Sequence, residues 1–295
     1  MTAPHVGARP DPGAEPRDCR IGALLARGVG VLALSPTPRL DAEVLLAFCA
    51  DVPRATLLAF PERSVSATAS ARFNAAVERR ARGEPIAYIR GEKEFYSLPL
   101  RVTPSVLIPR ADTEVLVDTA LHYLDVGERR SVLDVGTGSG AIALAIKRER
   151  PLAMVTALDC DGAALAVARD NAVRLGLEIR CVKSNWLDAL GGERFDFVVS
   201  NPPYVPSSDP QLAGPLRFEP RLALDGGNDG LAAYRALMRA MRGHLASRGL
   251  LLVEHGHDQR PAVLALAAEY GFAPRAVHDD LAGIPRIAVL AALEP

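Results

Sequence analysis

Four consecutive residues, Asn201-Pro202-Pro203-Tyr204, combine groups that can hold a planar NH2 group. They follow an apolar segment, residues 195–200, that is typical of a buried strand. The two prolines fix the backbone and remove two N–H donors, so carbonyls there can face a ligand without a competing local donor. The side-chain oxygen of Asn201 and the carbonyl of Pro202 can then both accept from one NH2 group. Tyr204 offers a flat face for stacking.

This arrangement suits methylation of an amide or aryl amine nitrogen. Such a nitrogen is a poor nucleophile because its lone pair is delocalised. Two acceptors that hold its hydrogens orient the lone pair toward a sulfonium methyl group, by positioning and electrostatics. No strong general base is needed, because the proton can leave once the nitrogen is cationic. We therefore expect Asn201, Pro202 and Tyr204 to be catalytic, and Pro203 to bind substrate with them.

A glycine-rich loop, Gly136-Thr137-Gly138-Ser139-Gly140, lies between an apolar segment at 131–135 and helical spacing at 141–148. Glycines permit positive φ and let the backbone approach a ligand closely, and the start of the helix offers free N–H groups. Ligands of open α/β sheets bind at the carboxyl ends of the strands. The loop therefore predicts a cofactor site. Together with Ala141 it also fits the relaxed dinucleotide-binding pattern.

Asp159 ends the next apolar segment, residues 154–159, about 20 residues after the loop, as the acidic residue of that pattern should. A carboxylate there can accept hydrogen bonds from two ribose hydroxyls. Both NAD and S-adenosylmethionine carry that ribose, so Asp159 does not distinguish them. The Asn201–Tyr204 motif does, and we expect S-adenosyl-L-methionine as the cofactor.

The amino-acid composition limits the kinds of partner and cofactor that the chain is expected to bind. The formal net charge of −1 lacks the basic excess of proteins that grip phosphates, so we expect a protein or small-molecule partner and no direct nucleic-acid binding. The four cysteines form no C-x-x-C pair, and we expect no metal. No apolar stretch approaches the roughly 20 residues of a membrane helix. Residues 1–18 indicate a disordered lead and no signal peptide, which favours a cytoplasmic protein with reduced thiols.

From residue 111 onward, strand and helix patterns alternate, which predicts an α/β fold with a seven-stranded, mostly parallel sheet and helices on both faces. The expected strands are 131–135, 154–159, 178–182, 195–200, 249–254, 277–279 and 286–290. The expected helices are 112–124, 141–148, 163–175, 230–245 and 260–270.

The preceding part of the chain has a different pattern. About four helices are expected between residues 17 and 82, including 21–27, 39–50 and 66–82, with Ser66 as the N-cap of the last and Gly83 as its stop. Prolines interrupt the alternating segments after residue 91, which predicts a β-hairpin linker. We therefore divide the chain into a lead (1–18), a helical domain (19–90), a linker (91–110) and a catalytic domain (111–295).

The glycine loop, Asp159 and the Asn201–Tyr204 motif resemble class I, Rossmann-like methyltransferases that modify amide or exocyclic amino nitrogens. Further segments are similar to the HemK/PrmC family of protein-(glutamine-N5) methyltransferases, which act on peptide chain release factors. This resemblance covers the chain from about Arg39 to Leu290. The segments are 83–91, Leu107-Ile108-Pro109-Arg110, Glu219-Pro220, Gly226-Gly227, Asp229-Gly230-Leu231, Glu254-His255-Gly256 and 280–283 with Arg286.

The resemblance implies roles for individual residues. Gly136, Thr137, Gly138, Ser139 and Gly140 would hold the methionine part of the cofactor, Asp159 its ribose, and Trp186 would pack on its adenine. Asn201 would contact both the cofactor and the substrate, and Pro202, Pro203 and Tyr204 would bind the substrate amide. In the family this amide belongs to the glutamine of the release factor's Gly-Gly-Gln loop, which the N-terminal helices would help to dock. We expect a monomer.

Two positions depart from the family pattern. Asn185 stands before Trp186, where the family usually has Asp. An amide oxygen can still accept from the adenine amino group, so we expect weaker or altered cofactor affinity. Ala111 replaces a common proline and is expected to loosen a loop near the site. Glu254 ends a predicted strand, and either faces the site or is solvated or held by a structural hydrogen bond.

Other functions remain as alternatives. The nearest is a glutamine methyltransferase of a ribosomal protein. A nucleic-acid amino methyltransferase would share the Asn201–Tyr204 motif, but the near-neutral charge counts against it. An NAD-dependent oxidoreductase would use the same glycine loop without that motif. A non-catalytic module that binds cofactor and partner is the last alternative.

Overall fold

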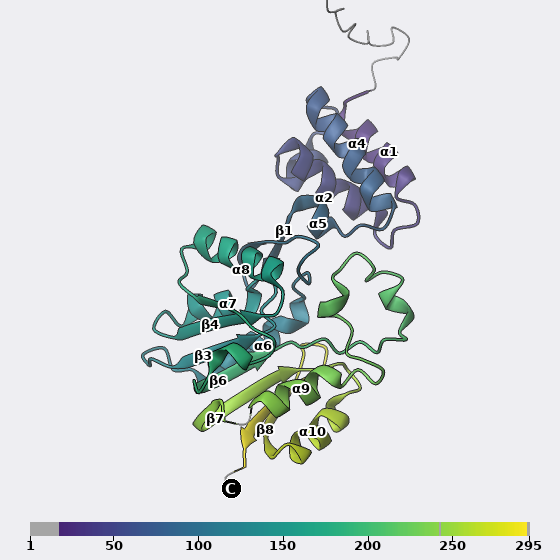
Figure 1. Ribbon diagram of the computed structural model, residues 1–295. Coiled ribbons are helices and arrows are strands. Elements are labelled where there is room, and N and C mark those ends of the chain that lie inside the picture. The colour runs from purple at the N-terminus through teal and green to yellow at the C-terminus, as the bar shows by residue number, and fades with distance from the viewer. Residues whose placement is uncertain (1–17, 242, 294–295) are drawn as a thin grey trace, which may run out of the picture. The chain divides into compact units, whose positions relative to one another are not determined.

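The computed structural model describes residues 18–241 and 243–293 (Figure 1). The disordered lead expected for residues 1–18 lies, apart from Asp18, outside these residues. The chain divides into two compact units, Met1–Arg90 and Gly91–Pro295. Among the described residues, the apolar core of the first unit and the two core clusters of the second share no residue.

The first unit is helical in its described part. Its helices are α1 (Ile21–Val31), α2 (Pro38–Ala50), α3 (Arg54–Ala59), α4 (Ala67–Ala81) and α5 (Ile86–Arg90). The predicted number of about four helices before residue 82 is confirmed. Helix α1 continues four residues past its predicted end, α3 had no predicted position, and α5 adds one short turn. The predicted cap of α4 is confirmed, because the Ser66 hydroxyl oxygen accepts from the Ala69 N–H at 3.1 Å. Phe73, Ala76 and Val77 are buried at helical spacing and pack α4 into the core.

An ion pair joins α2 to α4 inside this unit. The buried Asp41 carboxylate accepts from the Arg80 guanidinium at 2.7 Å, and from the hydroxyls of Ser35 at 2.6 Å and Thr37 at 2.9 Å. Burial alone would raise the pKa of the Asp41 carboxyl. The combined effect of these hydrogen bonds is larger, so the pKa lies below its ordinary value. The start of α2 is thereby fixed against the last turns of α4.

The second unit opens with the predicted hairpin, β1 (Glu92–Phe95) and β2 (Leu98–Arg101). Phe95 and Leu98 are buried in the same cluster as the sheet. The Asn171 side chain accepts from the Arg101 N–H at 2.7 Å and donates to the carbonyls of Arg101 and Ser139 at 3.0 and 2.9 Å. This buried amide connects the hairpin directly to the glycine loop.

The seven-stranded sheet is confirmed, with the order β5-β4-β3-β6-β7-β9-β8. The five strands β3 to β7 run parallel, and β9 pairs antiparallel with both β7 and β8. Their bounds are β3 (Ser131–Val135), β4 (Met154–Asp159), β5 (Arg180–Lys183), β6 (Phe195–Ser200), β7 (Leu245–Glu254), β8 (Phe272–Asp279) and β9 (Pro285–Ala292).

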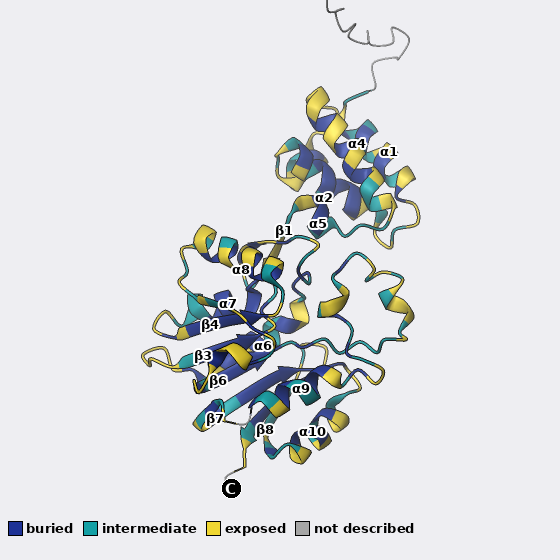
Figure 2. Cartoon of the chain, in the orientation of Figure 1, coloured by how far each residue is buried: buried dark blue, intermediate teal, exposed yellow. Residues whose placement is uncertain are grey.

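Helices cover both faces of this sheet. One core cluster joins a sheet face to α6 (Glu114–Tyr123), α7 (Ala141–Glu149) and the end of α8 (Gly162–Leu175). The other joins the opposite face to α9 (Ala232–Met241) and α10 (Arg260–Glu269). Figure 2 shows the strands buried and the outer sides of several helices exposed. Strands covered on both faces are apolar at successive positions, which explains their continuous apolar segments.

The predicted bounds are wrong at the C-terminal strands. The helix expected at 230–245 ends at Met241, and β7 begins at Leu245, four residues before the expected strand. Exposed Arg248, with φ of 63°, and a register shift opposite β6 interrupt its apolar pattern. The edge strand β8 begins at Phe272 and not at 277, because Pro274 and exposed Arg275 mask its alternation.

The strand order reverses beside β3. The chain adds β4 and β5 on one side of β3 and then returns to place β6 on the other. At such a reversal the loops after the two central strands turn in opposite directions and leave a crevice at their carboxyl ends. The glycine loop follows β3 and the Asn201–Tyr204 motif follows β6, so both predicted functional segments lie at this point.

Candidate active site

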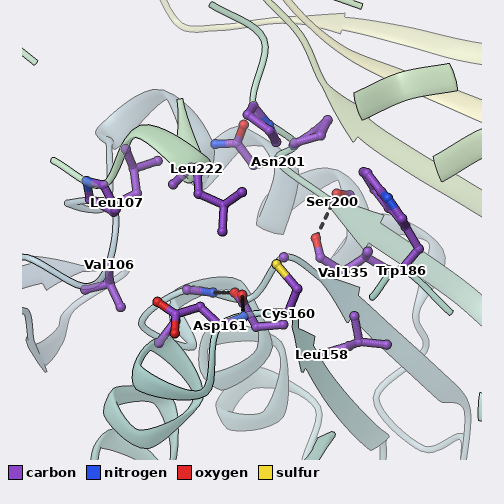
Figure 3. Close-up of a pocket in the computed structure, with 18 of the residues that line it drawn as sticks. Val106, Leu107, Val135, Leu158, Cys160, Asp161, Trp186, Ser200, Asn201 and Leu222 are labelled. Atoms are coloured by element: carbon purple, nitrogen blue, oxygen red, sulfur yellow. Dashed lines mark hydrogen bonds between the residues drawn. The ribbon is translucent and has the colours of Figure 1, made fainter. Parts of the chain in front are cut away.

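A cavity of about 220 Å³ occupies this crevice (Figure 3). Figure 3 shows Val106 and Leu107 on one side of it and Trp186 and Ser200 on the other. The segments that line it come from six places in the second unit. They are Ser105, Val106 and Leu107; Val135, Gly136 and Gly138; Leu158, Asp159, Cys160, Asp161 and Ala164; Ser184, Asn185 and Trp186; Ser200, Asn201, Pro202 and Pro203; and Pro220, Leu222 and Ala223.

The glycine loop contributes backbone to the cavity. Gly138 has φ of 55°, and its N–H donates to the Asp159 Oδ2 at 2.9 Å. This left-handed conformation favours glycine. Of the five loop residues, Gly136 and Gly138 line the cavity. Thr137 instead donates its hydroxyl to Asp134, Ser139 is buried, and Gly140 is the N-cap residue before α7.

Asp159 occupies the position expected of a ribose-binding carboxylate. Its Oδ1 accepts from the Asp161 N–H and its Oδ2 from the Gly138 N–H, each at 2.9 Å. An ionised carboxylate has about four acceptor positions, so both oxygens retain capacity for hydroxyl donors. Because Asp159 also lines the cavity, it fits a ligand that carries two neighbouring hydroxyls.

Trp186 and Asn185 form part of the wall after β5. The indole of Trp186, together with Leu158, gives this part of the cavity an apolar surface suited to a flat ring. The Asn185 Nδ2 lies 3.5 Å from an Asp188 carboxylate oxygen, and Asn185 is exposed. This contact occupies the Asn185 side-chain nitrogen and leaves the side-chain oxygen to accept a hydrogen bond from a ligand in the cavity.

The Asn201–Tyr204 motif extends from the end of β6. Asn201, Pro202 and Pro203 line the cavity, whereas Tyr204 is half-buried and does not line it. The Tyr204 carbonyl accepts from the Gln259 Nε2 at 3.0 Å. Burial raises the pKa of the Tyr204 phenol to about 12, so this side chain is neutral at physiological pH. It can offer a ring face or a hydrogen bond, but no charge.

Close backbone packing accounts for one glycine of the Asp229-Gly230-Leu231 segment. Gly230 has φ of 72°, and a Cβ there would lie 2.5 Å from the Tyr204 carbonyl oxygen. A larger residue would therefore displace the chain after Pro203. This glycine supports the position of the motif without contributing a functional side chain.

Another buried carboxylate holds the wall formed by residues 105–107. Glu219 accepts from the Ile108 N–H at 3.0 Å and pairs with the Arg110 guanidinium. The sequence prediction placed the loop at Ala111 near the site but did not predict that Glu219 holds it there. The missed wall residues, Val106, Leu107 and Leu222, are apolar, and their types carry no chemical signal.

Two buried acids lie close behind the cavity. Burial raises the pKa of Asp134 to about 7, although the carboxylate accepts from Thr137 and from the Ala143 N–H. Burial likewise raises the pKa of Glu254 to about 7 against hydrogen bonds from Thr113 and Asn201. Sequence reasoning did not single out Asp134 and left Glu254 undecided between the site and a structural role.

The remaining polar clusters give no sign of a metal centre. Within residues 18–241 and 243–293, no group of three or more His, Cys, Asp and Glu side chains is arranged to hold a metal ion. No disulfide bond joins any of the four cysteines within these ranges. In the same ranges, no helix is both long and apolar enough to cross a membrane.

A sheet of this topology, with a cavity beside an Asn-Pro-Pro-Tyr motif, defines the chain as a methyltransferase of the Rossmann-like class. Residues 112–213 match the model described as "Methyltransferase small domain". Two solved structures share the fold at 20% identity: a methyltransferase from Pyrococcus furiosus, with TM-score 0.51 over 72% of this chain and 95% of that chain, and a ribosomal protein L11 methylase from Lactobacillus delbrueckii subsp. bulgaricus, with TM-score 0.50 over 66% and 86%.

More similar relatives identify the family. Residues 23–91 match the "PrmC N-terminal domain" model. The chain is 49% identical over 255 residues to the release factor glutamine methyltransferase of Pseudomonas aeruginosa, covering 86% of this chain and 92% of that one. It is 47% identical over 269 residues to that of Burkholderia pseudomallei, covering 88% and 94%. The chain belongs to the release factor glutamine methyltransferase family.

Proposed function

We propose that this chain transfers the methyl group of S-adenosyl-L-methionine to the side-chain amide nitrogen, N5, of the glutamine in the Gly-Gly-Gln loop of peptide chain release factors. The observation that carries this proposal is the shared cavity. Asn201 and Pro202 line the same space as Asp159 and Trp186. A methyl donor held by Asp159 and Trp186 would therefore meet an amide held by Asn201 and Pro202.

The residues that line the cavity suit this cofactor. Asp159 would accept from the ribose hydroxyls, Trp186 would pack on the adenine, and the backbone at Gly136 and Gly138 would lie against the methionine part. Asn185 would meet the adenine amino group with its oxygen. Thr137, Ser139 and Gly140 would act indirectly, by holding the loop and the start of α7 in place.

The chain's own groups would prepare the nucleophile. When bound, the cofactor supplies an electrophilic methyl group. The Asn201 oxygen and the Pro202 carbonyl would accept the two amide hydrogens. Tyr204 does not line the cavity and would act by holding the prolines before it in place. The two acceptors would direct the nitrogen lone pair along the line of displacement. Transfer would form the N–C bond as the S–C bond breaks, and the cationic nitrogen would then lose a proton to solvent.

The helical unit is proposed to dock the release factor. Several large apolar side chains are exposed on it, including Leu34, Phe48, Leu58 and Phe60. The Arg63 guanidinium lies 3.8 Å from the ring centroid of Phe60, and that of Arg72 lies 5.7 Å from that of Phe48. Exposed aromatic and arginine side chains are enriched where proteins bind one another. We propose a monomeric cytoplasmic enzyme that contacts neither membrane nor nucleic acid directly.

Methyl transfer to a purified release factor tests this function. The protein is incubated with methyl-labelled S-adenosylmethionine and a bacterial release factor, and peptide mass spectrometry locates the label. The expected result is one methyl group on the glutamine of the Gly-Gly-Gln loop. With Asn201→Ala the rate should fall on the order of a hundredfold or more, because an acceptor for the reacting amide is lost.

Other outcomes would redirect the proposal. Label on a ribosomal protein or an RNA, but not on release factors, would support the cofactor assignment and change the assigned substrate. Measurable cofactor binding without transfer to any of these would favour a non-catalytic module. Full transfer by Asn201→Ala would remove Asn201 from the mechanism.

A further inference from the structure

Glu254 stands next to Asn201 but outside the cavity. Glu254 is the last residue of β7. The residue before it, Val253, pairs with Ser200, the last residue of β6, so Glu254 and Asn201 are neighbours. The Glu254 residue is 1% exposed and does not line the cavity. Any effect of its carboxylate on a bound substrate must therefore pass through another side chain.

Two side chains connect this carboxylate to the cavity. Both Thr113 and Asn201 act on the Glu254 carboxyl, whose pKa they lower against the larger, opposite effect of burial. The Asn201 Nδ2 also donates to the Thr113 hydroxyl oxygen at 3.2 Å. The Glu254 backbone is itself held, since its carbonyl accepts from the buried Tyr234 hydroxyl at 2.9 Å. The carboxylate Oε2 is buried without a hydrogen-bond partner.

The chemistry of these groups decides which end of the Asn201 amide faces the cavity. A carboxamide can rotate by 180° and exchange its oxygen for its NH2 group at little cost in shape. An ionised carboxylate only accepts hydrogen bonds. A neighbouring Glu254 carboxylate therefore holds the Asn201 nitrogen, and the Asn201 oxygen is left for the cavity.

We propose that Glu254 is a positioning residue, which fixes the Asn201 amide so that its oxygen faces the substrate amide. This inference rests on the proposed function, in which Asn201 accepts a hydrogen of the reacting nitrogen. If the amide were reversed, its NH2 group would face the substrate NH2 group, and two donors would meet. The Thr113 hydroxyl alone cannot prevent this reversal, because it can either donate or accept.

Protonation of Glu254 would release this constraint. A neutral carboxyl can donate to the Asn201 oxygen, so both orientations become possible. The charged and titratable groups around Glu254 are Arg286 on β9, which favours ionisation, and Asp112 beside α6, which opposes it. The phenols of Tyr204 and Tyr234 are neutral because their pKa values are raised, and burial lowers the pKa of His255, which keeps it neutral.

The direction of the pH dependence follows. Burial raises the pKa of Glu254 to about 7, so the carboxylate predominates above that pH and the neutral acid below it. The rate of methyl transfer at saturating cofactor should therefore fall as the pH decreases through about 7. Asp134 has a similar pKa but lies behind the glycine loop, so its protonation should alter cofactor binding.

The test compares Glu254→Gln with the matched surface control Glu193→Gln in the full-length protein. Glu193 pairs with Arg180 in solvent and does not line the cavity. Single-turnover rates with a release factor are measured from about pH 6 to pH 8.5, and cofactor affinity is followed by Trp186 fluorescence. The expected result for Glu254→Gln is a tenfold to hundredfold lower rate at the upper pH, no acid limb, and cofactor affinity within about twofold of wild type.

Three outcomes would contradict the proposal. They are a wild-type rate and acid limb in Glu254→Gln, a loss confined to cofactor affinity, or an equal loss in Glu193→Gln. If Glu254→Gln does not fold, the wild-type profile decides, because a rate that is flat through pH 7 excludes the mechanism. Thr113→Val is the second variant and should retain the acid limb. A wild-type protein that methylates no release factor would refute the proposed function itself, which is a separate result.

Discussion

Asp159 makes two contacts that a neutral amide cannot both reproduce. Its two oxygens accept from the backbone N–H groups of Gly138 and Asp161. In Asp159→Asn, one of those donors would meet an NH2 group. We expect cofactor affinity to fall about tenfold or more, because charged hydrogen bonds are lost and the loop is disturbed. Titration calorimetry with S-adenosylhomocysteine measures this.

The matched control for that variant is Asp170→Asn. Asp170 lies on the outer side of α8 and pairs with Arg101 at 2.9 Å in solvent. This control should bind the cofactor product with wild-type affinity. Equal weakening in both variants would show that loss of negative charge, and not the contacts of Asp159, determines affinity.

Asp134 gives the folded protein a pH dependence of its own. Burial raises its pKa from 3.8 to about 7, so the native state prefers the protonated acid more strongly than the unfolded chain does. The stability this provides is complete below the unfolded pKa and is lost as the pH rises through about 7. We expect the melting temperature of the ligand-free protein to decline between about pH 4 and pH 7, and Asp134→Asn to reduce that decline, to which Glu254 also contributes. Calorimetric scans at several pH values measure both, and an unchanged slope in the variant would exclude Asp134 as the source.

At the scale of elements, the cap of α4 is a contact that the sequence predicted and the structure confirms. Removal of the Ser66 hydroxyl leaves the Ala69 N–H without that acceptor. We expect Ser66→Ala to lower the stability of the helical unit by about 1 kcal/mol. Urea denaturation followed by far-ultraviolet circular dichroism measures the change. Cofactor affinity should remain at its wild-type value, and a parallel loss would contradict the assignment of this contact to the first unit.

Strands were predicted well where both sheet faces are covered. The segments chosen for β3, β4 and β6 match the structure, because their apolar positions are continuous. Beyond β6, Arg248 and Pro274 interrupt the pattern, and the true limits of β7 and β8 depend on pairing with β6 and β9. Pairing partners lie far away in the sequence, so local periodicity does not reveal these limits.

At the scale of the whole molecule, the two units have separate cores among the described residues. A ligand that binds only the folded second unit stabilises that unit by mass action. We therefore expect two thermal transitions in the full chain, of which only one shifts upward with S-adenosylhomocysteine. Differential scanning calorimetry across a ligand titration measures this. A single transition that shifts as a whole would show instead that the units unfold together.

The residue types of the sequence determined the family, the class of cofactor and three segments that line the cavity. Glycines after one strand, an acid after the next and an Asn-Pro-Pro-Tyr motif after another carry chemistry that is legible without coordinates. The order of these segments along the chain also predicted a parallel sheet, since each follows an apolar strand.

Only the tertiary structure decided which residues complete the site. Val106, Leu107 and Leu222 line the cavity because Glu219 ties distant segments together, and their apolar side chains gave no local signal. Glu254 was undecided in the sequence, and it became a neighbour of Asn201 through the pairing of β7 with β6. The physical reason is common to both cases. Types and spacing record what a side chain can do, whereas burial and the identity of its neighbours are fixed by contacts between residues far apart in the chain.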